Sequence, residues 1–298
     1  MQGGGVTAEE RKPDWLKIRP PGGAAYQRIK GSLQRSQLHT VCEEARCPNV
    51  NECWGGGTAT LMLLGDVCTR GCRFCAVASG HPQGRLDPQE PAKVAQTVSE
   101  WGLEYVVLTS VARDDLPDGG AGQFARAVRA IKGQNPKVLV EVLIPDFQGS
   151  IKSLRKVVEA RPEVIGHNIE TVARLAPLVR DRRAGYRQSL GVLESVKQLD
   201  ADVYTKSSLM LGLGETEAEV LHAMRDLRDA GVDFLTLGQY LQPSKRHLEV
   251  KEYVHPERFQ DYKGLGEELG FHYVASGPLV RSSYRAGEFF VEAMETSR

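Results

Sequence analysis

Short apolar runs alternate with amphipathic segments along most of the 298 residues of the chain. The apolar runs predict strands over 59–64, 105–109, 138–144, 164–169, 203–211 and 234–241. The segments that follow them predict helices over 91–101, 122–132, 151–160, 189–199, 217–230 and 256–269. Strands separated by helices indicate a parallel sheet. Six such units predict an α/β fold built as a partial (β/α)6 TIM-like barrel, because eight units would close a full barrel.

The two ends of the chain depart from this alternation. Residues 1–58 hold an N-terminal leader and a cysteine-rich segment, and residues 271–298 form a C-terminal extension. We therefore expect three parts, with the partial barrel over 59–270 between the two extensions. The sequence shows no internal repeat and no low-complexity linker.

The balance of charges disfavours one class of partner. Lys plus Arg number 38 and Asp plus Glu number 38, which gives a formal net charge of zero. Proteins that bind bare nucleic acid are usually strongly basic, so we expect no nucleic-acid partner. No apolar run approaches the roughly 20 residues of a membrane span, and the glycine-rich residues 1–7 lack the apolar core of a secretory signal. These features predict a cytoplasmic protein with no membrane partner.

All six cysteines lie in one short stretch, from Cys42 to Cys75. An even number of cysteines is compatible with a framework of disulfides. A reducing cytosol keeps thiols free, however, and disulfide staples are typical of small extracellular domains. Clustered cytosolic thiols more often bind metal, and their spacing indicates the kind of site.

The second group of cysteines has the spacing C-x3-C-x2-C, at Cys68, Cys72 and Cys75. A cubane [4Fe–4S] cluster takes four ligands, so three thiolates leave one iron open to a substrate or cofactor. This spacing is the signature of the radical S-adenosylmethionine (SAM) enzymes, in which the open iron binds the methionine moiety of SAM. Phe74 suits a loop that packs an aromatic ring next to the cluster. The alternative is a zinc site that borrows a histidine such as His81, although zinc sites usually come in paired C-x2-C units.

The first group has the spacing C-x4-C-x5-C, at Cys42, Cys47 and Cys53. It also lacks a fourth cysteine, and none remains elsewhere in the chain. A second cluster would therefore need an unusual ligand or an open site.

Polar residues lie near the carboxyl ends of the predicted strands, where α/β barrels carry their chemistry. Candidates for cofactor contact are Thr109, Ser110, Asn168, Glu170, Lys206 and Gln239. Asn168 and Glu170 are two residues apart on an extended segment, so both side chains can face the barrel mouth. Glu170 could accept hydrogen bonds from ribose hydroxyls, although any one of these groups could instead cap a helix. Asp114 and Asp115 are expected to position a loop rather than to react.

Several segments resemble the lipoyl synthase family of radical SAM enzymes, over almost the whole chain from Lys12 to near Phe290. They are TVCEEARCPN (40–49), CTRGCRFC (68–75), VLTSVARDDLPDGGA (107–121), HNIETV (167–172), LMLGLGE (209–215), GQYLQP (238–243) and RSSYRAG (281–287). One departure from the family pattern is Ser208, where we expect glycine.

The resemblance implies SAM and two [4Fe–4S] clusters as cofactors. The C-x3-C-x2-C group would hold the cluster that binds SAM, and the C-x4-C-x5-C group an auxiliary cluster whose fourth ligand is a serine of the RSSY motif. Carried over, that serine is Ser283, with Ser282 as the alternative. An alkoxide is a hard ligand among soft thiolates, so its iron is a natural place for the cluster to open.

The implied activity is that of a sulfurtransferase. Its substrate is an octanoyl group on a lysine of a lipoyl carrier protein or domain. A 5′-deoxyadenosyl radical abstracts hydrogen from C6 and C8, and the auxiliary cluster supplies both sulfur atoms. The implied partners are a ferredoxin- or flavodoxin-type reductant and an iron–sulfur carrier protein that rebuilds the cluster. The alternatives are another radical enzyme with two clusters, such as a biotin-synthase-like or methylthio-transferring one, and a non-catalytic electron-transfer or iron-sensing protein.

Overall fold

The computed structural model describes residues 12–18, 22–45, 47–55, 60–288 and 290. Among these residues the main sheet has eight strands, in the order β1-β2-β5-β6-β7-β8-β9-β10. The strands are β1 (His39–Thr40), β2 (Thr60–Leu63), β5 (Tyr105–Ser110), β6 (Leu139–Leu143), β7 (Val164–Gly166), β8 (Tyr204–Leu211), β9 (Phe234–Gln239) and β10 (Tyr273–Gly277). Neighbours from β2 to β10 are parallel, and the edge strand β1 is antiparallel to β2. Two shorter strands, β3 (Val67–Cys68) and β4 (Ala78–Ser79), form a separate parallel pair.

The six predicted strands correspond to β2 and β5 to β9, so the parallel α/β fold is confirmed. The order ends at β1 and β10, which do not pair with each other in the described part of the chain, and the barrel is open as predicted. The predicted first strand begins at residue 59, which lies outside the described residues, as do residues 1–7.

The seventh parallel strand, β10, was not predicted. It pairs with β9 residue by residue, from Tyr273 opposite Phe234 to Gly277 opposite Gly238. Its sequence YVASG carries a single β-branched residue, so the strand is defined by its pairing rather than by an apolar pattern.

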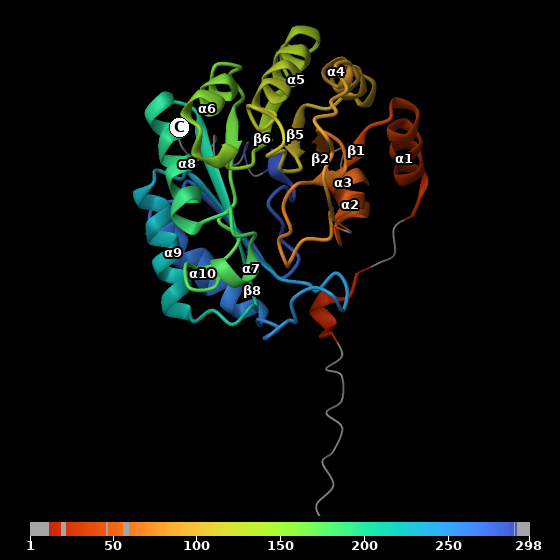
Figure 1. The fold of residues 1–298 in the computed structure, drawn as a ribbon. Coiled ribbons are helices and arrows are strands. Elements are labelled where there is room, and N and C mark those ends of the chain that lie inside the picture. Colours follow the sequence, from red (N-terminus) through yellow and green to blue (C-terminus); the bar gives the residue numbers. More distant parts are fainter. Residues whose placement is uncertain (1–11, 19–21, 46, 56–59, 289, 291–298) are drawn as a thin grey trace, which may run out of the picture.

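Helices form a ring around the outer side of the sheet (Figure 1). The helices of the described residues are α1 (Ala24–Ser36), α2 (Val41–Glu44), α3 (Val50–Gly55), α4 (Glu90–Trp101), α5 (Ala121–Gln134), α6 (Ile151–Val158), α7 (Ala176–Val179), α8 (Tyr186–Leu199), α9 (Glu217–Asp229) and α10 (Pro256–Glu268), with 3-10 turns at Asp14–Leu16 and Phe147–Gly149. The short helices α2, α3 and α7 are not part of this outer ring. All six predicted helices are present, as α4, α5, α6 and α8 to α10. Local signals set their ends: α9 begins with a capping box in which Thr216 N donates to Glu219 Oε2 at 2.8 Å, and α4 ends at Gly102 with a φ of 64°.

Apolar side chains fill the space between the sheet and these helices. One cluster packs β2, β5 and β6 against α4, α5 and α6, and a second packs β8 and β9 against α8, α9 and α10. Leu61, Leu63 and Val106 have no exposed surface, at 0% each. Burial on both sides explains why these strands read as continuous apolar runs. Among the described helices, none combines the length and apolar character needed to cross a lipid bilayer.

The chain after β10, residues 278–288 and 290, runs along the interior of the sheet, and we call it the tail segment. It passes so close to β9 that a Cβ on Gly238 would lie 2.1 Å from the carbonyl oxygen of Val280. Further on, the ring of Phe290 packs 5.8 Å from that of Tyr105, at the amino end of β5. The tail segment therefore spans the barrel from one end of its strands to the other.

Candidate active site

A cavity of about 550 Å³ lies at the carboxyl ends of the strands. The predicted site residues that line it are Cys42, Cys47, Cys53, Cys68, Cys72, Phe74, Cys75, Thr109, Ser110, Asn168, Glu170, Gln239, Ser282 and Ser283. Lys206 is the one predicted site residue that is not part of its lining. The fold therefore brings both cysteine groups, the strand-end residues and the RSSY motif to one place.

The C-x3-C-x2-C group lies on a loop over residues 68–75, which we call the cluster loop. Backbone N–H groups point at two of its sulfurs. Arg70 N lies 3.4 Å from Cys68 Sγ, and Asp181 N lies 3.3 Å from Cys72 Sγ. Hydrogen bonds to the sulfur atoms are among the features that tune iron–sulfur clusters. All six cysteines are free thiols, as the sequence predicts.

Arg70 holds the cluster loop against the ends of β5 and β6. Its guanidinium donates to Asp114 at 2.9 and 2.8 Å and to Asp146 at 2.7 Å through two nitrogens. Arg70 is 6% exposed and Asp146 0%. Burial is the largest single effect and opposes ionisation of both carboxyl groups, but the hydrogen bonds and the charge of Arg70, together with other nearby donors and charges, outweigh it and lower the pKa of each. The protein's own ion pairs therefore fix the loop that carries the thiols.

The neighbouring Asp115 also holds a loop in place. It accepts a hydrogen bond from Arg113 Nε at 2.8 Å and one from the backbone N–H of Gly84 at 2.7 Å. The hydrogen bonds from Arg113 lower the pKa of Asp115 to about 2. Both aspartates of the RDD sequence thus serve as loop anchors.

The buried and half-buried thiols of both groups are compatible with iron–sulfur clusters. Burial is the main cause that raises the pKa of Cys75 to about 12, of Cys47 to about 11 and of Cys53 to about 12. Coordination reverses this effect, because a metal deprotonates the thiol that binds it. No three His, Cys, Asp or Glu side chains converge on a single metal ion within the described ranges. A cluster does not require such convergence, since each cysteine binds a different iron. His81 lies exposed outside this cavity.

Asn168 and Glu170 face the cavity from the segment after β7. Asn168 Nδ2 donates to Glu170 Oε1 at 3.2 Å, and Glu170 N donates to the carbonyl oxygen of Ser208 at 3.0 Å. Glu170 has a φ of 67°, a left-handed conformation that is costly for a residue with a side chain. Burial is the main cause that raises its pKa. A residue with a strained backbone, whose carboxyl group has a raised pKa and faces a cavity, is a candidate for ligand binding.

The other strand-end residues differ in how much hydrogen-bonding capacity they leave for a ligand. Ser110 Oγ is buried and has no hydrogen-bond partner among the described residues. Thr109 Oγ1 donates to the carbonyl oxygen of Leu143 at 3.1 Å. Gln239 Nε2 donates to three backbone carbonyls at 3.0–3.1 Å, and its Oε1 accepts a backbone N–H at 2.8 Å. Ser110 is therefore the freest of the three, and the Gln239 amide holds neighbouring loops together.

Lys206 lies at the opposite end of the barrel. Its Nζ donates to the two carboxylate oxygens of Glu141 at 2.9 and 3.1 Å, and Tyr105 Oη donates to the same carboxylate at 2.7 Å. Strand β8 runs for 8 residues from Tyr204, so Lys206 is near its amino end while the cavity is at its carboxyl end. The structure gives no support for a role of Lys206 in cofactor binding.

Two further residues of the cavity wall, His167 and Arg180, were not predicted as site residues. His167 Nε2 lies 2.9 Å from Ser189 Oγ, and Arg180 Nη1 donates to the same oxygen at 2.7 Å. Burial is the main cause that lowers the pKa of His167 to about 4, so its ring is neutral near pH 7. Arg180 Nε is buried without a hydrogen-bond partner in the part of the chain that the structure describes. His167 belongs to the HNIETV segment, whereas no motif singles out Arg180.

Hydrogen bonds join the N-terminal cysteine segment to the tail segment. Asn49 Nδ2 donates to the carbonyl oxygen of Leu279 at 2.6 Å, and Tyr284 Oη donates to Glu52 Oε1 at 2.7 Å. These contacts connect residues more than 200 positions apart and bring the RSSY motif to the first cysteine group.

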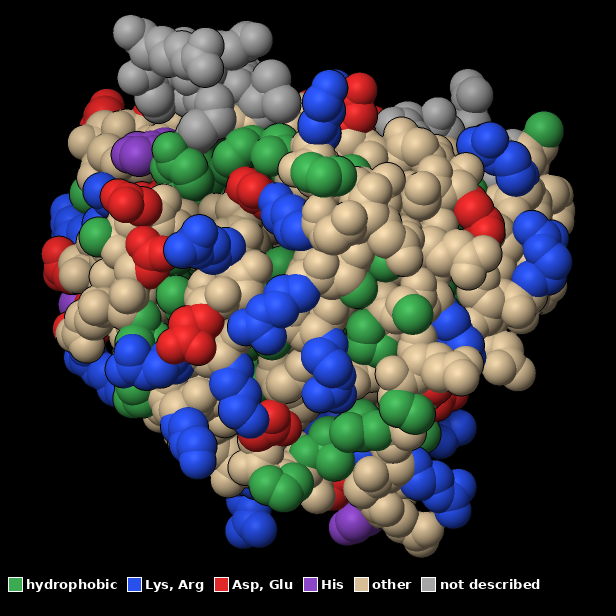
Figure 2. All heavy atoms as spheres, turned by 90° about the horizontal axis from the view of Figure 1, so that it is seen from above, with side chains coloured by type: hydrophobic (Ala, Val, Ile, Leu, Met, Phe, Trp, Pro, Cys, Tyr) green, Lys and Arg blue, Asp and Glu red, His purple; other side chains and the backbone are tan. Residues whose placement is uncertain are grey.

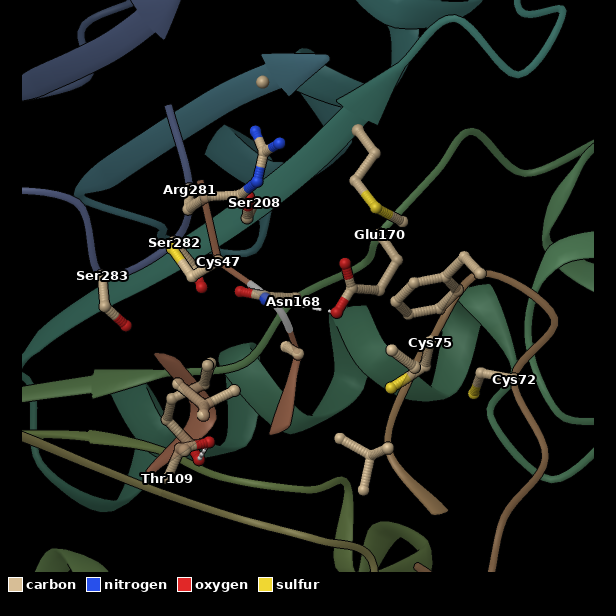
Figure 3. Close-up of a pocket in the computed structure, with 18 of the residues that line it drawn as sticks. Cys47, Cys72, Cys75, Thr109, Asn168, Glu170, Ser208, Arg281, Ser282 and Ser283 are labelled. Carbon is tan, nitrogen blue, oxygen red and sulfur yellow. Dashed lines mark hydrogen bonds between the residues drawn. The ribbon is translucent and has the colours of Figure 1, made fainter. Parts of the chain in front are cut away.

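The two cysteine groups occupy different sides of the cavity. Figure 3 shows Cys72 and Cys75 on one side and Cys47 and Ser283 on the other. Asn168 and Glu170 lie between them in this view, joined by their hydrogen bond. The arrangement leaves space for a ligand that reaches from one thiol group toward the other.

Comparisons with known proteins place this fold and site in a class. Residues 62–237 match the family model of the radical SAM superfamily. Similar solved structures include the FeFe-hydrogenase maturase HydG from Carboxydothermus hydrogenoformans, with a TM-score of 0.57, 14% identity, and coverage of 90% of this chain and 77% of that chain. Another is Streptococcus suis SuiB bound to precursor peptide SuiA, with a TM-score of 0.58, 8% identity, and coverage of 85% and 53%. These likenesses show the fold, and together with the superfamily match they define a radical SAM enzyme, a class that carries a [4Fe–4S] cluster and SAM.

Closer relatives identify the family within this class. Residues 5–47 match the model of the N-terminal domain of lipoyl synthase. Lipoyl synthase of Myxococcus xanthus is 60% identical over 97% of this chain and 97% of its own length. Lipoyl synthase of Thermus thermophilus is 58% identical over 96% and 89%, and the mitochondrial lipoyl synthase of Culex quinquefasciatus is 57% identical over 97% and 77%. The chain belongs to the lipoyl synthase family.

Proposed function

We propose that the enzyme inserts two sulfur atoms, at C6 and C8, into an octanoyl group carried on a lysine of a lipoyl carrier protein or domain. The proposal rests on one observation above all. Thiols from the N-terminal segment, hydroxyls from the tail segment and thiols of the cluster loop line the same cavity. When bound, a SAM-linked cluster would supply radical cleavage of SAM, and an auxiliary cluster would supply the sulfur.

The ligands of the first cluster would be Cys68, Cys72 and Cys75. Their loop is held by Arg70, and the N–H groups of Arg70 and Asp181 lie within 3.4 Å of two sulfurs. A rigid loop with three ligands keeps the fourth iron site open toward the cavity. These residues would therefore hold the cluster and present its open position to SAM.

Residues around this open position would bind SAM. We assign Phe74, Thr109, Ser110, Asn168 and Glu170 to direct contact, and Gln239 to the support of the loops around them. The free hydroxyl of Ser110 and the carboxyl group of Glu170 are suited to the ribose and the amino group of the ligand.

The ligands of the auxiliary cluster would be Cys42, Cys47, Cys53 and Ser283. A serine oxygen is a harder ligand than a thiolate. The iron bound by Ser283 would therefore be the one iron of the cluster without a cysteine ligand, and the natural place for the cluster to open. The contacts of Asn49 with Leu279 and of Tyr284 with Glu52 support this assignment, because they hold the motif against the cysteine segment.

The segments divide the work. In the proposed organisation, residues 1–58 and 271–298 hold the auxiliary cluster, and the barrel over 59–270 holds the first cluster and SAM. The apolar acyl chain would reach between them in a cavity that shields it, since a carbon radical abstracts hydrogen from nearby thiols and weak C–H bonds. The partners would be an octanoylated carrier, a ferredoxin- or flavodoxin-type reductant and an iron–sulfur carrier protein, in the cytoplasm, where thiols stay reduced.

The test is a single incubation. Reconstituted enzyme receives octanoylated carrier protein, SAM and dithionite, and mass spectrometry follows the carrier. We expect a mass gain from two sulfur atoms together with 5′-deoxyadenosine. Formation of 5′-deoxyadenosine without sulfur on the carrier would contradict the proposal, and the absence of both would favour an electron-transfer or iron-sensing role.

A further inference from the structure

We propose that the outer surface of the cluster loop docks a small acidic protein that donates single electrons. This inference rests on the proposed function, because the first cluster must be reduced before SAM is cleaved. The surface consists of Arg73, Leu178, Arg182 and Arg183, and we call it the donor face. Three observations support it: the short distance to a cluster ligand, an exposed apolar centre and a positively charged rim. The electron balance of the step is given after them.

The donor face lies directly against a ligand of the first cluster. Asp181 N is 3.3 Å from Cys72 Sγ, and Arg73 N donates to the carbonyl oxygen of Val179 at 2.9 Å. One hydrogen bond thus joins the Cys72 sulfur to the backbone of Asp181, and the next residue along the chain, Arg182, is exposed. A protein docked here is separated from the cluster by a very short stretch of polypeptide.

The centre of the donor face is apolar. Leu178 is 56% exposed, more than any other large hydrophobic residue among those the structure describes. It lies on α7, which packs on the cluster loop, and its carbonyl oxygen accepts a hydrogen bond from Arg73 Nη1 at 3.3 Å. Interfaces of transient electron-transfer complexes are small, and an interface core carries few charges within a polar rim.

The rim of the donor face is positively charged. Arg73, Arg182 and Arg183 are exposed. One exposed carboxylate lies close by, that of Glu249, which pairs with Lys251 at 3.3 Å and follows Leu248, whose backbone N–H donates to the carbonyl oxygen of Arg73 at 3.2 Å. The side chain of Asp181 is 12% exposed and pairs with Arg183 at 2.8 Å. That of Asp114 is 14% exposed and pairs with Arg70 of the cluster loop at 2.8 Å and with Arg183 at 3.2 Å, so the positive charge of the rim comes mainly from Arg73 and Arg182. Positive potential in a chain of zero net charge selects an acidic partner and speeds its encounter.

A second basic surface serves as the internal comparison. Figure 2 views the molecule from the side of α5 and α6 and shows Lys and Arg side chains gathered there. Its exposed cations include Arg126, Arg129, Lys152 and Arg155. Arg129 lies midway along α5, on the flank of the barrel rather than on the cluster loop, so charge there should not direct a donor to Cys72.

The electron balance of the step is simple. A reduced donor such as flavodoxin loses one electron to the cluster, and the cluster gains that electron. No atom or group is transferred, and the donor leaves oxidised by one electron. Docking at the donor face requires no opening of the substrate cavity.

The test compares two charge reversals, Arg182→Glu and Arg129→Glu. Neither side chain belongs to the proposed catalytic machinery. The first readout is the Kd of the reconstituted enzyme for an acidic flavodoxin, measured at several salt concentrations. The second is the rate of 5′-deoxyadenosine formation, driven either by reduced flavodoxin or by dithionite, which needs no docking site.

We expect Arg182→Glu to raise the Kd about tenfold, to flatten its salt dependence and to lower the flavodoxin-driven rate to a similar degree. The dithionite-driven rate should equal that of the wild type, and Arg129→Glu should change none of these values. An unchanged Kd in Arg182→Glu, or an equal effect of Arg129→Glu, would overturn the donor face. A matching loss of the dithionite-driven rate would also overturn it, because dithionite needs no docking site. Failure of the proposed sulfur insertion would leave the Kd comparison intact, so the two claims fail separately.

Discussion

Ser283 supplies a hydroxyl to the side of the cavity where three cysteines lack a fourth partner. The fully reconstituted wild type should hold about eight irons per chain. We expect Ser283→Ala to hold fewer, with a content that approaches the roughly four irons of a single cluster. Sulfur insertion should be lost, while cleavage of SAM persists because the cluster loop is untouched. Iron analysis and product assays check both expectations.

Ser282→Ala is the matched control, because Ser282 lines the same cavity one position earlier. It should keep both clusters and most of the activity. The opposite result, with Ser282→Ala inactive and Ser283→Ala active, would move the ligand assignment to Ser282.

Asp146 binds the guanidinium of Arg70 from a fully buried position. Asp146→Asn keeps the shape but removes the charge that pairs with Arg70 at 2.7 Å. Loss of a hydrogen bond to a charged group costs about 1.5–3 kcal/mol in the free energy of unfolding. Urea titration of the apoprotein should show this loss, and the first cluster should dissociate faster.

The control for this change is Glu267→Gln, which removes an exposed pair with Lys263. Exposed pairs contribute about 0–1 kcal/mol, so the unfolding curve should barely move. Equal stability of Asp146→Asn and wild type would show that the ion pairs of Arg70 do not hold the cluster loop.

For single residues, the sequence predicts the candidate metal ligands better than it predicts the residues that hold those ligands in place. The cysteine spacings define ligand sets because a thiolate is useful only beside its partners. Asp146 and Arg180 are distant from the cysteines in sequence, and only the folded chain brings them there. Lys206 was predicted as a site residue because its strand was identified correctly. The strand pattern does not show that Lys206 lies near the amino end of the strand, away from the cavity.

The tail segment acts as an element without regular structure over most of its length. Phe290 anchors its end among the rings of Tyr105, Tyr204 and Phe234, at 5.8, 5.7 and 6.1 Å. We expect Phe290→Ala to lower the free energy of unfolding by about 3–5 kcal/mol. Auxiliary iron should also be lost more readily, because Ser283 is no longer held from both sides.

Phe290→Leu is the conservative partner of this variant and should retain most of the stability and the iron. The two substitutions are compared by urea denaturation and by iron retention during dialysis. Full retention of auxiliary iron in Phe290→Ala would show that the contact with the N-terminal segment suffices to position Ser283.

Element prediction succeeded where a segment has a strong pattern of its own. The long helices and the six apolar strands follow from local periodicity, capping and burial. β10 and the tail segment depend on contacts with β9 and with the N-terminal segment instead. A pattern in one segment cannot report such contacts. β10 therefore escaped prediction, and the contact of the tail segment with the N-terminal segment was expected only from the family resemblance.

For the molecule as a whole, the proposed auxiliary cluster ties the first cysteine segment to the tail segment. Removal of this cluster should therefore lower the melting temperature, because a ligand that binds only the folded state stabilises it. Cys53→Ala, with the first cluster intact, should melt below the fully loaded wild type and near Ser283→Ala. Thermal unfolding followed by circular dichroism measures this difference.

The comparison with cluster-free protein completes this test. Without any cluster, wild type and Ser283→Ala should melt within a few degrees of each other. A large difference between the two apoproteins would mean that the serine stabilises the fold by itself. The predicted class and the open barrel follow from the sequence patterns. The meeting of the two chain ends was implied only by the resemblance to the lipoyl synthase family, since no local pattern encodes it.

The contact between Glu52 and Tyr284 joins residues 232 positions apart. During translation, at about 5–20 residues per second, the two are synthesised on the order of 10–50 seconds apart. The three thiols of the proposed auxiliary site therefore emerge from the ribosome long before Ser283, their proposed fourth partner. If the proposed ligand set is correct, the auxiliary cluster can be completed only after the whole chain has been synthesised.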